Sequence, residues 1–189
     1  MKIALFGGTF DPVHLGHLYV AETVIKQLDI DQVWFVPAGN PPHKEQCMFT
    51  FEQRVHLLKK AISNHPSFYV YENDLRENDK SYTIYLINDL KRLYPDYEFS
   101  FIIGADNVVC LTTWFEYKSL LELIDFIVID REITDKHKWE DLDYYNKLKF
   151  INIPLINISS SQIRTNLMQN KSINKLIPEN IISDIKDFL

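Results

Sequence analysis

The stretch Ile3–His17, IALFGGTFDPVHLGH, joins an apolar run of strand length to a segment rich in glycine and histidine. Within it, Gly7–His17 holds three of the chain's five glycines and two of its six histidines. An ordinary strand-to-helix connection needs only a single Gly and some Asn or Ser. The concentration of glycine therefore predicts a ligand that approaches this backbone closely.

The first half of the loop predicts contacts with an anion. We expect Gly7 and Gly8 to allow positive φ angles and to let a ligand touch backbone N–H groups. Thr9 offers a hydroxyl and an N–H to a phosphate, and Asp11–Pro12 predicts a tight bend before the helix. An ordinary turn is the alternative for the glycine pair. The dinucleotide pattern G-x-G-x-x-G cannot be aligned here.

The two histidines indicate the same kind of ligand. His14 and His17 are three residues apart, so they share one face at a helix N-terminus. The helix dipole and free N–H groups favour an anion there, and Gly16 leaves room for a flat group such as a purine. Two alternatives stay open: a metal-binding pair, although no third ligand is suitably placed nearby, and a structural role for either ring.

The rest of the chain alternates strand-like and helix-like segments. Apolar runs of strand length are Ile3–Phe6, Val33–Val36, Phe68–Tyr71, Phe99–Ile103, Phe126–Ile129 and Phe150–Ile153. Apolar residues recur at helical spacing in Leu18–Leu28, Phe51–Ile62 and Thr83–Leu93. This order predicts an α/β fold with a mostly parallel sheet, helices on both faces and right-handed crossovers.

The C-terminal part is expected to hold two short helices. Ser159–Leu167 begins with serines that can cap it, and Pro178–Leu189 places Pro178 at the first helical position. Asp130–Lys149 is charge-dense and weakly periodic, which predicts a surface excursion. Because no internal repeat or low-complexity linker interrupts the chain, we expect residues 1–189 to form a single domain.

The unusual segments all follow expected strands. They are Gly7–His17, Pro37–Lys44, Gly104–Trp114 and Ile158–Arg164, and three of them contain all five glycines. In open parallel sheets, ligands bind beyond the carboxyl ends of the strands. We therefore expect these four segments to form one binding crevice.

Composition narrows the class of ligand. The formal net charge is −6, and the sequence has no cluster of Lys and Arg of the kind that nucleic-acid binders show. A small ligand is therefore favoured over a nucleic acid. No apolar stretch approaches the ~20 residues that a membrane span needs, and the start lacks a signal-peptide pattern. Cys47 and Cys110 have neither metal-site nor disulfide spacing. These features predict a cytoplasmic protein that binds neither nucleic acid nor membranes.

His-Leu-Gly-His after Gly-Gly-Thr-Phe-Asp-Pro resembles the H-x-G-H signature of the nucleotidyltransferase superfamily. The whole string GGTFDPVHLGH is similar to bacterial nicotinate-nucleotide adenylyltransferases, and PPHK, SYT, GADNVVCLTTW and ISSSQIR follow in that family's order. The resemblance spans about Lys2 to Pro178. It implies a Rossmann-like fold of the nucleotidyltransferase type with a short helical C-terminal part. It also implies adenylyl transfer from ATP to nicotinate mononucleotide, which yields deamido-NAD and pyrophosphate.

The resemblance assigns roles to residues. Catalytic roles fall on His14, His17, Lys44 and Arg164, with His17 on the reacting α-phosphate and the two cations on the leaving phosphates. It implies ATP contacts at Gly7, Gly8, Thr9, Phe10, Gly16, Gly104, Asp106, Ile158, Ser159 and Ser160, and acceptor contacts at Tyr82, Thr83 and Trp114. Mg²⁺ is expected to arrive on the nucleotide's phosphates, with no strong protein ligand.

Several residues keep plainer readings. Lys44 can be a solvated surface residue, the serines can serve only as caps, Asp106 can cap a helix, and Trp114 can belong to the core. Arg164 is harder to explain this way, because its neighbours are neutral and it has no apparent structural partner.

The chain departs from the family in two places. Ile84–Leu86 replaces the usual Tyr-Asp-Thr after SYT, and Arg131 lacks the Pro-Gly that commonly follows. These departures leave the details of the acceptor contacts open. An H-x-G-H transferase can also use another acceptor, namely nicotinamide mononucleotide, FMN or pantetheine phosphate, although phosphopantetheine enzymes usually carry T-x-G-H instead. A non-catalytic nucleotide sensor also stays open. A class I aminoacyl-tRNA synthetase is disfavoured, because a K-M-S-K-S-like loop and a tRNA-binding extension are missing. A homo-oligomer also stays open.

Overall fold

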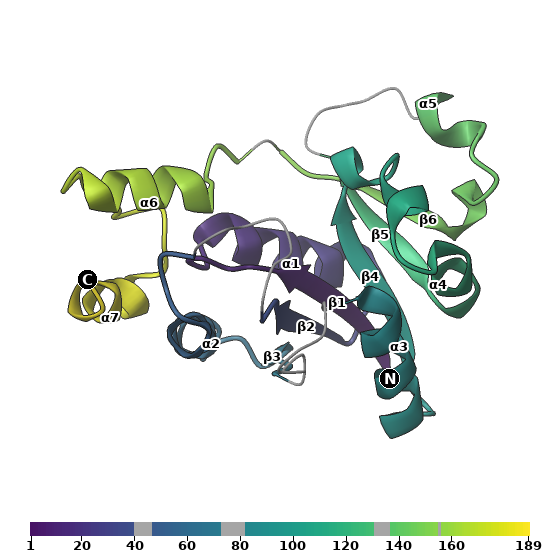
Figure 1. Ribbon diagram of the computed structural model, residues 1–189, viewed down its shortest axis with the longest axis horizontal. Coiled ribbons are helices and arrows are strands. Elements are labelled where there is room, and N and C mark those ends of the chain that lie inside the picture. Colours follow the sequence, from purple (N-terminus) through teal and green to yellow (C-terminus); the bar gives the residue numbers. More distant parts are fainter. Residues whose placement is uncertain (40–46, 73–81, 131–136, 155) are drawn as a thin grey trace.

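The computed structural model describes residues 1–39, 47–72, 82–130, 137–154 and 156–189. In this part of the chain, six strands form one parallel sheet in the order β3-β2-β1-β4-β5-β6 (Figure 1). The strands are β1 (Lys2–Gly8), β2 (Gln32–Pro37), β3 (Phe68–Val70), β4 (Glu98–Gly104), β5 (Asp125–Asp130) and β6 (Leu148–Asn152). The α-helices are α1 (Leu15–Gln27), α2 (Phe51–Ala61), α3 (Thr83–Leu93), α4 (Tyr117–Leu123), α5 (His137–Glu140), α6 (Ser160–Met168) and α7 (Ile182–Asp187). The parallel α/β fold expected from the sequence is confirmed.

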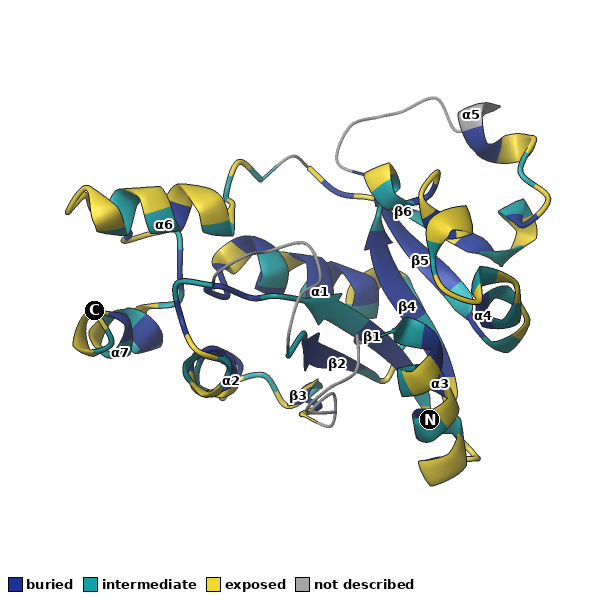
Figure 2. Cartoon of the chain, in the orientation of Figure 1, coloured by how far each residue is buried: buried dark blue, intermediate teal, exposed yellow. Residues whose placement is uncertain are grey.

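Helices cover both faces of the sheet, because the side chains of each strand alternate between two cores. Ala4 points into a core with apolar side chains of α1, α2, α6 and α7. Its neighbours Ile3 and Leu5 point into the second core, with apolar side chains of α3 and α4. Burial on both sides explains why the strands are continuous apolar runs rather than alternating ones. Figure 2 shows β2, β4 and β5 buried over most of their length.

The strand order reverses between β1 and β4. From β1 the sheet continues through β2 to β3 in one direction, and from β4 through β5 to β6 in the other. Connections that leave neighbouring strands toward opposite faces open a crevice at such a point. The loop after β1 and the turn after β4 begin there, so the topology places Gly7–His17 and Gly104–Trp114 at one sheet edge.

The segment Asp130–Lys149 is not entirely a surface excursion. Trp139 and Tyr144 are buried in the second core, and the Tyr144 hydroxyl donates to the Val108 carbonyl at 3.1 Å. Burial raises the pKa of Tyr144. The two aromatic side chains thus bring part of this charge-rich segment into the core, because the burial of large apolar rings contributes more free energy than the burial of smaller side chains.

The C-terminal helix also starts later than expected. Pro178 precedes a single 3-10 turn, Glu179–Ile181, and α7 begins only at Ile182. Pro178 is therefore not the first residue of α7. The turn and α7 together bury Ile181 and Ile185 in the first core, beside α2. No helix in the described ranges is both long and apolar enough to cross a bilayer.

Candidate active site

The glycines after β1 provide space rather than unusual backbone angles. No glycine in the described residues has a positive φ, so that expectation for Gly7 and Gly8 is wrong. A Cβ at Gly7 would lie 2.8 Å from the Phe101 ring, and one at Gly8 would lie 3.0 Å from the Phe10 ring. Phe10 itself takes the left-handed conformation, with φ of 49°, and its ring packs 5.7 Å from that of Phe35. The buried Phe10 ring compensates the cost of that conformation.

The histidine pair forms at the start of α1. The rings of His14 and His17 stack with centroids 3.6 Å apart and planes 23° apart. The backbone N–H of His14 donates to Nδ1 of His17 at 3.2 Å. An Nδ1 that accepts carries no proton, so the neutral imidazole of His17 carries its proton on Nε2, on the other side of the ring. His17 can therefore donate a hydrogen bond from Nε2.

Two details of this turn differ from expectation. A Cβ at Gly16 would lie 3.0 Å from Nδ1 and 3.1 Å from Cε1 of His14, so the glycine makes room for the histidine ring itself. The N–H of Leu15, at the start of α1, donates to the carbonyl of Leu176 at 3.0 Å. That donor is therefore already used, and the anion-binding capacity of this helix start rests on its remaining N–H groups and its dipole.

Arg164 reaches the same loop from α6. Its Nη1 donates to the backbone carbonyl of Asp11 at 2.7 Å and lies 3.6 Å from the Asp11 carboxylate. Its Nη2 donates to Ser161 Oγ at 3.1 Å. Arg164 is therefore not a cation without a structural partner. Its side chain is still 21% exposed, so it keeps guanidinium surface for an anionic ligand.

The serines at the start of α6 have structural contacts. Ser159 caps the helix, because its hydroxyl accepts from the N–H of Gln162 at 3.1 Å. The Ser160 hydroxyl donates to the Pro12 carbonyl at 3.0 Å, which ties α6 to the loop after β1. Ile158 packs partly buried against the first core. The capping reading is confirmed for Ser159, and a ligand contact there stays a prediction.

Asp11 and Arg54 organise the loops, and sequence reasoning did not give either a site role. The buried Asp11 carboxylate accepts from the N–H groups of Met48 and Phe49 at 3.0 and 2.9 Å. The buried Arg54 guanidinium donates to the carbonyls of Thr9 and Gly39 at 2.6 and 3.3 Å. A signal was present in the sequence: Arg54 occupies the apolar face of its expected helix, where charged residues are seldom buried without a partner.

A second group of aromatic residues lies in the segment after β4 and just before α3. Trp114 is half-buried, edge-on to the rings of Phe101 and Phe126 at 5.9 and 6.2 Å. Tyr82 stands just before α3, and its ring lies 4.6 Å from that of the exposed Phe115, with the two planes tilted by 31°. Trp114 therefore borders the core and still keeps accessible surface. Phe115 was not expected as part of this group.

Two smaller expectations concern the same area. Thr83 is the first residue of α3, and the side chain of the preceding Tyr82 makes no capping hydrogen bond. Asp106 is exposed in the 3-10 turn after β4, which has no side-chain cap. A Cβ at Gly104 would clash with Oδ1 of Asp106, so this glycine allows the carboxylate to lie over the backbone. The capping alternative for Asp106 is not supported.

Known proteins resemble this chain along its whole length. The Cytidylyltransferase-like family matches residues 5–166. "Probable nicotinate-nucleotide adenylyltransferase" of Oceanobacillus iheyensis is 37% identical over 186 residues, which cover 98% of this chain and 94% of that protein. The protein of the same name from Exiguobacterium sibiricum is 38% identical over 188 residues, covering 100% and 97%. The chain belongs to the nicotinate-nucleotide adenylyltransferase family.

A solved structure agrees with this family assignment. Nicotinic acid mononucleotide adenylyltransferase of Plasmodium falciparum, in complex with NaAD, has a TM-score of 0.76 and 25% identity, and the match covers 100% of this chain and 98% of that one. The same enzyme in complex with APC has a TM-score of 0.74. The nucleotidyltransferase type of Rossmann-like fold, expected from the H-x-G-H resemblance, is thereby confirmed.

Lys44, which is expected in the site of this family member, lies outside the described residues. So do Ser81 and Arg131, which belong to segments compared with the family above. Among the residues that are described, no group of three or more His, Cys, Asp or Glu side chains could hold a metal ion. The Asp11 carboxylate of the loop after β1 is buried and already accepts from two backbone N–H groups. The other groups, namely ring nitrogens, the Arg164 guanidinium and hydroxyls, do not fit a protein-held Mg²⁺, which prefers carboxylate and phosphate oxygens.

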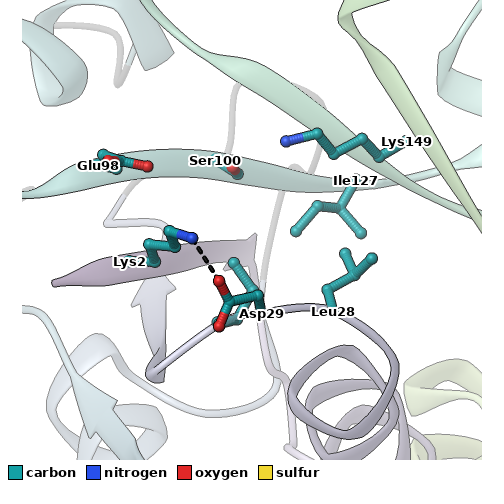
Figure 3. Close-up of a pocket in the computed structure, with 8 residues that line it drawn as sticks. Lys2, Leu28, Asp29, Glu98, Ser100, Ile127 and Lys149 are labelled. Carbon is teal, nitrogen blue, oxygen red and sulfur yellow. Dashed lines mark hydrogen bonds and ion pairs between the residues drawn. The ribbon is translucent and has the colours of Figure 1, made fainter.

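A cavity of about 240 Å³ lies at the opposite edge of the sheet, where β1 and β4 begin (Figure 3). At its side, Lys2 forms an ion pair with Asp29, which raises the pKa of Lys2 and lowers that of Asp29. Lys149, also in the lining, pairs with Asp125 at 2.9 Å. Charges that already neutralise one another hold an anionic substrate poorly, so this cavity is not the candidate active site.

Proposed function

We propose that this chain transfers the adenylyl group of ATP to nicotinate mononucleotide, giving deamido-NAD and pyrophosphate. One observation carries the proposal: Arg164, 153 residues from Asp11 in sequence, bonds to the loop that carries the stacked histidines. Arg164 is thus tied to the loop that carries the histidine donor, at the strand switch point. The family assignment supplies the reaction that such a pair serves.

The reaction needs charge stabilisation rather than acid–base chemistry. A phosphate oxygen of nicotinate mononucleotide, already anionic at pH 7, attacks the α-phosphorus of ATP, and the bond from that phosphorus to the oxygen bridging to the β-phosphate breaks. No proton has to be removed from the nucleophile. The protein therefore acts by holding two phosphates in line and by neutralising charge as pyrophosphate leaves.

We assign roles to residues accordingly. His17 donates from Nε2 to the α-phosphate, while His14 stacks on its ring and supports its orientation. Arg164 binds the leaving phosphates, and Lys44 joins it there. Gly7, Gly8 and Phe10 present backbone at the nucleotide. Mg²⁺ supplies charge neutralisation when it is bound to the nucleotide's phosphates, and no protein carboxylate is assigned to it.

We place the acceptor between Trp114 and the start of α3. Trp114 offers a flat face to the pyridine ring. The uncapped helix start at Tyr82, together with the Thr83 hydroxyl, offers donors to the nicotinate carboxylate. An amide in the same position would direct its NH₂ at those donors and leave a buried group unpaired, at roughly 1–3 kcal/mol. The acid should therefore be preferred about 5- to 150-fold over the amide.

A pyrophosphate-release assay with ATP and a panel of phosphorylated acceptors tests the proposal. The panel contains nicotinate mononucleotide, nicotinamide mononucleotide, FMN and pantetheine phosphate. We expect turnover with the first and a much lower kcat/KM with the second. A ratio near one would overturn the nicotinate assignment and leave adenylyl transfer intact. ATP binding without turnover on any acceptor would favour the nucleotide sensor instead.

A further inference from the structure

Arg54 is a fully buried cation that the proposed chemistry leaves without a task. It lies in the first turns of α2, is 1% exposed, and donates to the carbonyls of Thr9 and Gly39 at 2.6 and 3.3 Å. Those carbonyls follow β1 and β2, two neighbouring strands whose carboxyl ends border the crevice. A single guanidinium therefore joins the two segments that follow these strands.

The burial of this charge is energetically costly, so a purely structural role is a poor explanation. Desolvation lowers the pKa of Arg54, and the nearby Asp11 carboxylate opposes that shift. Within the described residues, the Nε of Arg54 has no hydrogen-bond partner. A well-packed apolar side chain is often at least as stabilising as a buried ion. What an apolar residue cannot do is hold two carbonyls in defined directions.

The direction of the Thr9 carbonyl determines where the next N–H points. The Thr9–Phe10 peptide is trans, since the cis bond found in this loop is Asp11–Pro12. In a trans peptide the C=O and N–H point in opposite directions. With the Thr9 carbonyl on Arg54, the Phe10 N–H points away from α2.

That N–H is available for a ligand. The ring of Phe10 lies edge-on to the His17 ring, with centroids 5.0 Å apart, so the Phe10 residue borders the histidine pair. No hydrogen bond from the Phe10 N–H to another described residue is present. Buried N–H groups are nearly always paired in the working state of a protein. A phosphate oxygen beside His17 would provide the acceptor.

We propose that Arg54 is a positioning residue for the nucleotide phosphates. It holds the Thr9 and Gly39 carbonyls on the side that faces α2, so that the N–H groups between β1 and α1 face the phosphates of ATP. Arg54 itself touches no substrate. The inference rests on the proposed function, because it takes ATP as the nucleotide that occupies the crevice.

The test compares Arg54→Lys with Leu58→Ala. A lysine ammonium is a point charge that cannot reproduce the planar fork on two carbonyls, while Leu58 is a buried residue of the same helix that belongs only to the core. We expect Arg54→Lys to weaken ATP binding about tenfold and adenosine binding less than about twofold, since adenosine has no phosphates. Leu58→Ala should lower the melting temperature and leave the ratio of the two affinities unchanged.

Both affinities are measured by calorimetry or competition, well below the melting temperature of each variant. An unchanged ATP-to-adenosine ratio in Arg54→Lys would overturn the positioning role. Arg54→Gln, which keeps an amide NH₂ donor but removes the positive charge, is the second variant. It should also weaken ATP binding more than adenosine binding. If neither variant folded, the role would be structural and the inference wrong. Because these readouts need no acceptor, they remain decisive even if nicotinate mononucleotide proves not to be a substrate.

Discussion

Replacing Gly16 by Ala should lower catalysis and leave stability unchanged or slightly higher. Gly16 lies in the first turn of α1, where alanine is intrinsically the better helix former, by up to about 1 kcal/mol. The added Cβ, however, would lie 3.0 Å from Nδ1 of His14. Ordinary contacts begin at 3.4 Å, so the ring has to move by about 0.4 Å.

That movement reaches the reacting atoms through ring stacking. The His14 ring lies 3.6 Å from the His17 ring, so a displaced His14 also shifts the donor that we place on the α-phosphate. A misplacement of 1 Å can cost about 100-fold in rate. If the loss of transition-state stabilisation is proportional to the displacement, 0.4 Å costs about 1 kcal/mol, which is about sixfold in kcat.

The assay is steady-state pyrophosphate release, with thermal unfolding measured on the same preparations. Leu15→Ala is the matched control, because Leu15 is exposed in the same turn and should change neither quantity much. The reasoning fails if Gly16→Ala keeps the wild-type kcat. It also fails if kcat falls only in proportion to a loss of folded protein, since the effect is then on stability and not on ring position.

Three further predictions concern single side chains. His17→Ala should lower kcat by about 10²–10³ and change the KM for ATP little, because its hydrogen bond strengthens as charge builds in the transition state; a raised KM alone would contradict this. Arg164→Ala should weaken ATP binding more than AMP binding in calorimetry, because AMP lacks the leaving phosphates, and equal losses would exclude that role. Asp184 accepts from Lys60 at 2.5 Å and pairs with His56 at 2.6 Å, which lowers its pKa from 3.8 to about 2. Its contribution to stability is therefore fully present above about pH 4 and is lost as the pH falls toward 2. Asp184→Asn should flatten acid unfolding, monitored by circular dichroism, in that window, and identical curves for the two proteins would refute it.

The sequence alone determined the fold class and the sheet edge at which we place the site. Strands buried on both faces are continuous apolar runs, and amphipathic helices repeat every three to four residues, so both patterns are visible locally. Glycines and histidines cannot be explained by either pattern. Their position directly after the expected strands was therefore sufficient to indicate the crevice that the sheet order forms beside β1.

Only the tertiary structure decided why particular residues are there. The loop glycines were expected to adopt positive φ, but the structure assigns that conformation to Phe10. Gly7 and Gly8 are needed for another reason, because the Phe101 and Phe10 rings leave no room for a Cβ there. Trp139 was expected at the surface and is buried, because it packs in a core built from strands that are distant in sequence.

The same holds for the charged residues that organise the site. Arg54 and Asp11 act through partners 15 to 45 residues away, and Arg164 reaches Asp11 across 153 residues. A charged residue in a sequence is most often a solvated one. Which of them the fold buries against backbone carbonyls and N–H groups depends on how strands and helices pack, and no local pattern carries that information.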